Sequence, residues 1–266
     1  LHCPPLVLFS LITVGYSANA LGGAGGPLAV LIIAIVAAEL GKAVSKETKV
    51  DILVTPLVTI FVGVGLSMLI AAPIGAAASQ VGTLIMWATE QAPLIMGILV
   101  SVIVGVALTL PISSAAICAA LGLTGLAGGA AVAGCCAQMV GFAVMSFREN
   151  GWGGLLAQGL GTSMLQMGNI VKNPRIWIAP TLASMVTGPL ATMVFQLENI
   201  PAGAGMGTCG LVGPIGIYTA MSGGGPRMWA GILMICFILP AVLTWIFGEL
   251  SRKAGWIREG DLKLDL

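Results

Sequence analysis

The sequence predicts an all-α, polytopic membrane protein: a transmembrane helical bundle of about eight spans, with two or three glycine-rich segments that re-enter the membrane without crossing it. Mean hydropathy is +1.04, and 58% of the residues are hydrophobic while 8% are charged. The apolar runs are continuous, whereas a transmembrane barrel would alternate polar and apolar residues along short strands. The 38 glycines suit tight helix packing and broken helices.

Four spans are predicted in the first part of the chain. They cover residues 6–20, 27–44, 52–72 and 74–89. Pro73 is expected to end the third span, because a proline inside a helix removes a hydrogen bond and clashes with the preceding turn. The fourth run is less apolar than its neighbours, so we expect a buried helix there.

Four further spans follow. They cover residues 93–110, 126–147, 176–196 and 228–250. Gln138 lies in the middle of one of them and is expected to face the bundle interior, because an amide exposed to lipid is costly. The intervening segments 111–125, 151–171 and 201–221 are glycine-rich and carry polar residues, which predicts half-helices or re-entrant segments.

The basic residues predict the orientation, since cytoplasmic loops carry an excess of lysine and arginine. They form four clusters: Lys42/Lys46/Lys49, Arg148, Lys172/Arg175 and Arg252/Lys253/Arg258/Lys263. With eight crossing spans, all four clusters fall on one side and Arg227 on the other. We therefore expect both termini in the cytoplasm, one transmembrane transport domain over residues 1–250, and a cytoplasmic tail over residues 251–266.

One segment is unusually polar for this chain and is the first candidate binding site. Its polar side chains, with Gly161 among them, are Gln158, Thr162, Ser163, Gln166 and Asn169. On one continuous helix, residues 158, 162, 166 and 169 would share a face. Such a stripe predicts a hydrogen-bonding wall for a hydroxyl-rich solute. The alternative is that these side chains pair membrane helices with one another.

A shortened copy of this segment follows later in the chain. Gly159-Leu-Gly-Thr-Ser163 reappears as Gly205-Met-Gly-Thr-Cys209, 46 residues further on. The predicted orientation places the first copy on the cytoplasmic side and the second, with Gly205, Gly207 and Thr208, on the outer side. Two related segments entering from opposite faces are typical of secondary-transporter sites, although chance similarity is an alternative in a glycine-rich chain.

Glu198 is a second kind of candidate, because it precedes the second copy and is the only acidic residue between Glu149 and Glu249. It can accept hydrogen bonds from a solute or serve as a proton site. The alternative is a solvated carboxylate at the membrane surface. The short run Arg148-Glu149-Asn150 is interpreted as a polar helix end.

Several classes of function are excluded by the sequence. A net charge of +1 provides no basic face for nucleic acid. Neither a Walker loop nor the motifs of zinc proteases and serine hydrolases occur in the chain. The six cysteines form no CxxC pair, so we expect neither a metal site nor a bound cofactor. No residue is assigned a catalytic role.

Five blocks of the sequence resemble the EIIC-like membrane family of the phosphotransferase system, which includes proteins named as perfringolysin regulators. The blocks, which span most of residues 100–225, are Ile112-Ser-Ser-Ala-Ala-Ile, Gly134-Cys-Cys-Ala-Gln-Met-Val-Gly-Phe142, Gly154-Leu-Leu-Ala-Gln-Gly-Leu-Gly-Thr-Ser-Met-Leu-Gln166, Asn169-Ile-Val-Lys-Asn-Pro174 and Gly203-Ala-Gly-Met-Gly-Thr-Cys-Gly-Leu-Val-Gly213.

The resemblance implies a sugar-translocating IIC subunit. Such a subunit is a multi-pass protein of the bacterial inner membrane, usually a homodimer in membrane lipid, that moves a sugar inward while soluble IIB and IIA components carry the phosphoryl group. The matched positions implied to bind the sugar are those of the two glycine-rich segments. The family is usually longer at its N-terminus, so we expect further residues before the leucine that begins this chain.

The chain also departs from the better-known IIC proteins, which place a histidine and a glutamate near a sugar hydroxyl. None of its apolar runs contains histidine, and only Glu198 or Glu90 can stand in for the glutamate. Two alternatives therefore stay open beside the permease. One is a membrane-bound regulatory protein that senses a solute without transport, and the other is an ion-coupled secondary transporter.

Overall fold

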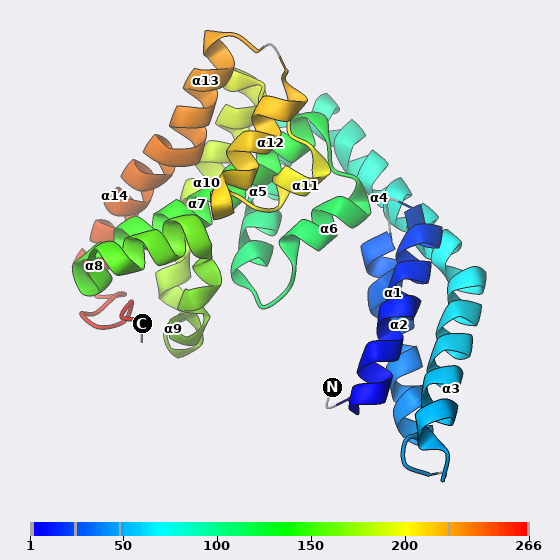
Figure 1. The fold of residues 1–266 in the computed structure, drawn as a ribbon. Helices are drawn as coiled ribbons and strands as arrows, with labels where there is room; N and C mark the ends of the chain where they lie inside the picture. Colours follow the sequence, from blue (N-terminus) through cyan, green and yellow to red (C-terminus); the bar gives the residue numbers. More distant parts are fainter. Residues whose placement is uncertain (1–2, 24–25, 48, 223, 265–266) are drawn as a thin grey trace. The chain divides into compact units, whose positions relative to one another are not determined.

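The computed structural model describes residues 3–23, 26–47, 49–222 and 224–264. Within these residues the regular structure is helical, apart from one isolated β-bridge between Gly125 and Asn199 (Figure 1). Six helices of the described chain are long and apolar enough to cross a membrane, and two shorter apolar helices accompany them. The predicted all-α, multi-pass membrane fold is confirmed.

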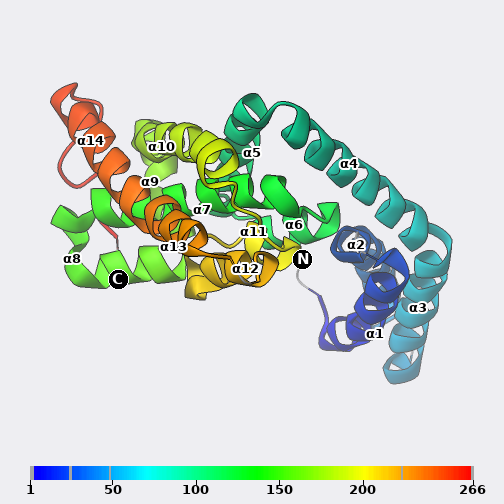
Figure 2. The same ribbon diagram turned by 90° about the horizontal axis from the view of Figure 1, so that it is seen from above.

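The chain divides into two compact units, of which the first comprises residues 1–83 and 119–122. Its helices α1 (Pro5–Gly22), α2 (Gly26–Val44) and α3 (Asp51–Leu66) lie side by side (Figures 1 and 2). Mostly small and branched apolar side chains fill the space between them, so the helices approach closely. These buried side chains are Val14, Ala18, Ala29, Ile33, Ala37 and Ala71.

The helix that begins at Asp51 does not end at Pro73, so the predicted boundary between the third and fourth spans is wrong. It continues through a π-helical turn (Ser67–Ala71) into α4 (Ala72–Gln91), giving 41 uninterrupted helical residues. The wider π turn directly before Pro73 makes room for the proline ring, which would otherwise clash with the carbonyl one turn back. Few side chains of α4 are buried, which also contradicts the buried helix expected there.

The second unit comprises residues 84–118 and 123–266 and is built around one buried helix. This helix, α7 (Gly125–Met145), packs against α5 (Pro93–Thr109), α10 (Ile178–Pro189) and α14 (Leu239–Lys253) (Figure 2). In its most apolar window, 89% of the residues are buried. Small residues allow this close packing, since most of the first half of α7 is glycine and alanine.

The glycine-rich segments form short, broken helices. They are α6 (Ser114–Leu121), α8 (Phe147–Leu156), α9 (Met167–Lys172), α11 (Pro201–Ala204) and α12 (Val212–Ala220). Helix α13 (Pro226–Leu233) then leads through a π-helical turn, Met234–Ile238, into α14. The interrupted backbone expected from the glycines is therefore present. The grouping of residues 1–250 into one transport domain stays a prediction.

Candidate functional site

The first polar segment is not one helix. Residues Ala157–Gly161 form a π-helical turn and Ser163–Gln166 a 3-10 turn, and α9 follows. Between the two turns Thr162 is extended (φ −160°, ψ 141°), and its hydroxyl accepts a hydrogen bond from the Met164 amide at 3.1 Å. Thr162 thus caps the next turn, and the predicted single stripe through residues 158, 162, 166 and 169 is wrong at this position.

Three of the four predicted side chains, Gln158, Gln166 and Asn169, nevertheless meet. Together with Ser146 they form a row that we call the amide ladder. Gln158 Nε2 donates to Ser146 Oγ at 2.8 Å, and Gln166 Nε2 donates to Gln158 Oε1 at 3.0 Å. Asn169 Nδ2 donates to Gln166 Oε1 at 2.8 Å. Ser146, Gln158 and Gln166 are fully buried. Within the row each side-chain N–H donates inward, toward Ser146, which leaves the second amide hydrogens of Gln166 and Asn169 for other acceptors.

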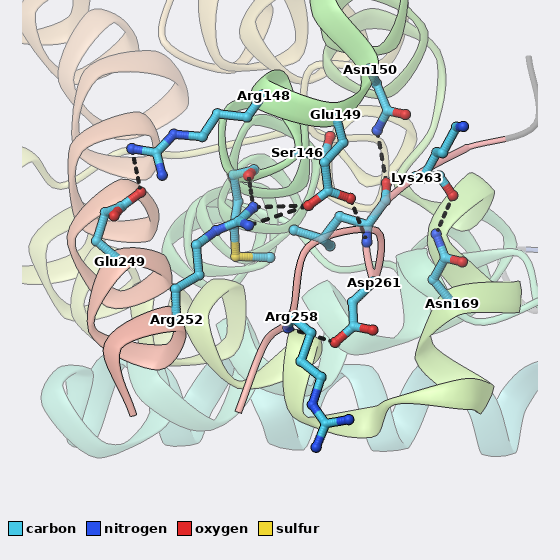
Figure 3. A network of polar contacts seen from close by, with 12 residues as sticks. Ser146, Arg148, Glu149, Asn150, Asn169, Glu249, Arg252, Arg258, Asp261 and Lys263 are labelled. Atoms are coloured by element: carbon cyan, nitrogen blue, oxygen red, sulfur yellow. Dashed lines mark hydrogen bonds and ion pairs between the residues drawn. The ribbon is translucent and has the colours of Figure 1, made fainter. Parts of the chain in front are cut away.

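The outer end of the amide ladder meets the backbone of the segment that follows α14. Gln166 Nε2 donates to the Leu262 carbonyl at 3.0 Å. Asn169 Nδ2 donates to the Lys263 carbonyl at 2.9 Å (Figure 3). The sequence did not indicate this contact, because it joins positions more than 90 residues apart through backbone atoms. Each amide nitrogen of Gln158, Gln166 and Asn169 therefore has two acceptors in this conformation.

Ser163 belongs to a separate polar chain inside the second unit. Its hydroxyl shares a hydrogen bond of 2.9 Å with that of Thr109 in α5, and Thr109 Oγ1 lies 3.4 Å from Gln138 Oε1 in α7. Trp177 Nε1 donates to the same Gln138 oxygen at 2.9 Å, and Gln138 Nε2 donates to Thr181 Oγ1 at 3.3 Å. Gln138 faces the bundle interior, as predicted. It ties the polar segment to α10.

The two glycine-rich segments are in direct contact. Thr208 Oγ1, in the second segment, donates to the Gly159 carbonyl of the first at 2.5 Å. The Gly205 carbonyl accepts from Ser114 Oγ at 2.6 Å. Gly207 has a positive φ of 55°, and a β-carbon there would approach the Cys135 backbone. A larger residue at Gly207 would therefore be strained and would push this segment away from α7.

Two predicted site residues lie apart from these contacts. Glu198 is exposed, and its carboxylate makes neither a hydrogen bond nor an ion pair with the residues that the structure describes. Its neighbour Asn199 is buried instead, and its Nδ2 donates to the Gly213 carbonyl at 3.3 Å. Gly161 is exposed at the end of the π-helical turn and has open space beside it.

A charged group beside the amide ladder was missed by the sequence interpretation. Glu149, expected at a solvated helix end, has a side chain that is only 7% exposed and pairs with Arg252 at 3.2 Å. Its other oxygen accepts from the Leu262 amide at 2.9 Å. Asn150 donates to the Leu262 carbonyl and accepts from the Leu264 amide, both at 2.8 Å. Figure 3 shows this network, whose partners are again distant in sequence.

The cavities near these groups are apolar. One of about 310 Å³ lies between α8 and α14 and is lined mainly by aromatic and aliphatic side chains, including Phe147, Trp152 and Trp245. The amides of the ladder do not line it. Among the described residues, no group of three or more histidines, cysteines or acids is placed to hold a metal ion.

Comparison with known protein families matches residues 1–264 to the family described as Phosphotransferase system, EIIC. No curated protein and no solved structure matches the chain. The family match includes both glycine-rich segments, the amide ladder and the segment that covers it, and it extends well beyond the blocks between residues 100 and 225. The chain therefore belongs to the EIIC family of the phosphotransferase system and is a multi-pass membrane component of a sugar permease of that system.

Proposed function

We propose that this chain is the sugar-translocating subunit of its system, and that the sugar binds where the two glycine-rich segments meet. The observation that carries the proposal is the Thr208–Gly159 hydrogen bond. It joins the segments at the residue that directly follows Gln158 of the amide ladder. Broken helices that present backbone and side-chain hydrogen-bonding groups inside a membrane protein are typical of transporter binding sites.

The amide ladder suits a sugar because its groups are polar and neutral. Its outer N–H groups, on Gln166 and Asn169, donate to acceptor oxygens, which sugar hydroxyls provide. Neutral hydrogen bonds contribute about 1 kcal/mol each, so several of them hold a polyol while still allowing its release. In the proposed site, the backbone of Gly161, Gly205 and Gly207 and the hydroxyls of Thr162, Ser163 and Thr208 line the sugar, and Glu198 receives it at the outer mouth.

The proposed subunit works with soluble partners and has a defined orientation in the membrane. Phosphoryl chemistry takes place on soluble IIB and IIA components that dock on the cytoplasmic loops. The two glycine-rich segments re-enter from opposite sides, both termini are cytoplasmic, and the protein acts as a homodimer in a bacterial inner membrane. The grouping of basic residues supports this orientation.

Replacement of Gln166 tests the site. In proteoliposomes containing the protein and a phosphorylated IIB partner, we expect Gln166→Ala to reduce sugar uptake about tenfold, because one buried donor is lost and the Gln158 oxygen loses its partner. Gln80→Ala, at an exposed position of α4, is the matched control and should leave uptake unchanged. The assay covers hexoses, amino sugars and hexitols.

The outcomes separate the proposed function from the site assignment. Uptake that is equal in wild type and Gln166→Ala would show that the amide ladder is not the sugar site. Binding of a sugar without flux in any condition would instead indicate a sensor. Uptake that depends on a proton or sodium gradient and continues without phosphorylated IIB would indicate an ion-coupled transporter.

A further inference from the structure

The segment after α14 folds back onto the second unit. We call residues 254–264 the strap. Gly255 (φ 71°) ends α14 and Gly260 (φ 94°) turns the chain again, both in conformations that favour glycine. Ile257 and Leu262 bury their side chains beside Phe142 and Ile176. The strap is therefore an ordered part of the unit, held by two apolar anchors.

Polar side chains of the body hold the backbone of the strap. Asn150 binds both the Leu262 carbonyl and the Leu264 amide, as a neighbouring strand would. Glu149 accepts from the Leu262 amide while it is paired with Arg252 (Figure 3). Most of these contacts use strap backbone atoms, which are the same for any residue at those positions.

A second set of hydrogen bonds binds the strap nearer its start. Asn173 Nδ2 donates to the Trp256 carbonyl at 2.9 Å and to Asp261 Oδ2 at 2.7 Å. The same Asp261 oxygen accepts from the Arg258 amide at 2.8 Å, which closes the turn. Asn173 and Asn150 thus hold the two ends of the strap with side chains outside the amide ladder, and Asn150 shares the Leu262 carbonyl with Gln166.

The strap uses the donors that the sugar would need. The Leu262 and Lys263 carbonyls accept from Gln166 and Asn169, the outer N–H groups of the amide ladder. Those carbonyls occupy the acceptor positions that a sugar oxygen would take, and both cannot be filled at once. On the basis of the proposed function, we propose that the strap is a built-in competitor: it closes the site when sugar is absent and leaves the amide ladder when sugar binds.

The competition has a measurable consequence. The apparent dissociation constant of a ligand rises as the fraction of protein in the binding-competent state falls. Weakening the strap at a position outside the amide ladder should therefore strengthen sugar binding. If the strap only supported the structure, the opposite result would be expected, because loosening the strap would disturb the amide ladder and weaken sugar binding. Gln166→Ala has a different effect from weakening the strap. It removes an N–H group that would donate to the sugar, while Asn150, Glu149 and Asn169 still bind the strap.

Asn150→Ala in the full chain tests the proposal. Binding of radiolabelled glucose, galactose, mannose, fructose and N-acetylglucosamine is measured in lipid nanodiscs for each protein. We expect Asn150→Ala to bind the preferred sugar about fivefold more tightly than wild type, because the strap loses both of its hydrogen bonds to Asn150 and the open state becomes more populated. Glu259→Ala, an exposed position on the strap itself, should bind like wild type. Asp261→Ala, which releases the other end of the strap, should act like Asn150→Ala and provides a second variant.

Hydrogen exchange of residues 256–264 in wild type provides an independent measurement. Saturating sugar should speed exchange there by at least about tenfold, since the Leu262 and Leu264 amides lose their partners. Equal or weaker sugar binding by both folded variants, or strap exchange that sugar leaves unchanged, would overturn the strap proposal while the permease stands. If no sugar binds to any of the proteins, the proposed function fails, and the strap proposal fails with it.

Discussion

At the scale of single residues, the contact between the two glycine-rich segments depends on one hydroxyl. Gly159 lies in the last turn before the chain becomes extended at Thr162, where helix carbonyls lack the amides of a following turn. Thr208 supplies the missing donor. Glycine at position 159 leaves its carbonyl accessible. The repeated sequence therefore contributes a backbone acceptor from the first segment and a side-chain donor from the second.

Thr208→Val should therefore loosen the pair of segments. Valine has nearly the shape of threonine but cannot donate, so we expect the free energy of unfolding to fall by about 1–3 kcal/mol. Thermal unfolding followed by tryptophan fluorescence in detergent measures the change. Thr219→Val is the matched control, because the exposed Thr219 hydroxyl bonds only to the Ile215 carbonyl of its own helix. Equal melting temperatures for the two variants would contradict the role assigned to Thr208.

At the scale of helices, the second unit depends on the close approach of α5 and α7. Gly134 faces the Ser101 carbonyl so closely that a β-carbon would overlap it. Ser101 in turn donates to the Ser184 carbonyl of α10 at 2.8 Å. The three helices are thus held by backbone proximity and one hydroxyl, as expected where lipid provides little hydrophobic driving force between helices.

Gly134→Ala should separate α5 from α7. Overpacking of this kind costs about 1–3 kcal/mol, although alanine is the better helix former by about 1 kcal/mol. Gly153→Ala provides the control, because Gly153 lies in α8 with open space around it. We expect a lower melting temperature for Gly134→Ala and an equal or higher one for Gly153→Ala. Stabilisation by both substitutions would show that the contact between α5 and α7 tolerates a methyl group.

At the scale of the whole molecule, the long helix through Pro73 changes the count of crossings but leaves the charge pattern consistent. If only the six long apolar helices cross, two of them lie between the Lys46 and Lys172 clusters, and two more lie between Lys172 and Lys253. All basic clusters then share one side, and Arg227 lies on the other. In this count the two shorter apolar helices, α5 and Cys209–Ala220, do not cross the membrane.

Cysteine labelling tests this orientation. We expect a membrane-impermeant maleimide to reach Lys46→Cys, Lys172→Cys and Lys253→Cys from the same, cytoplasmic side, because positively charged loops stay there. Arg227→Cys is the control for the opposite face and should react only from outside. Labelling of the Lys46 and Lys253 positions from opposite sides would mean that α5 crosses the membrane too, and that the Lys42/Lys46/Lys49 cluster lies on the opposite side from the other three clusters.

The sequence by itself determined the class of the fold and which residues are unusual in it. Continuous apolar runs require helices in a membrane, because hydrocarbon leaves no other way to satisfy the backbone. The same cost makes buried amides conspicuous, and so Gln158, Gln166, Asn169 and Gln138 were identifiable without a structure. Each of them forms hydrogen bonds with other polar groups of the second unit.

Only the tertiary structure decided how those amides are arranged and what covers them. Helical spacing assumes a regular helix, but the π-helical turn moves Thr162 out of the row. A π turn likewise carries the helix through Pro73. The strap was expected to be a tail, because sequence patterns do not reveal backbone carbonyls as partners. Leu262 and Lys263 close the amide ladder through atoms that every residue has, and only folding brings those atoms to Gln166 and Asn169.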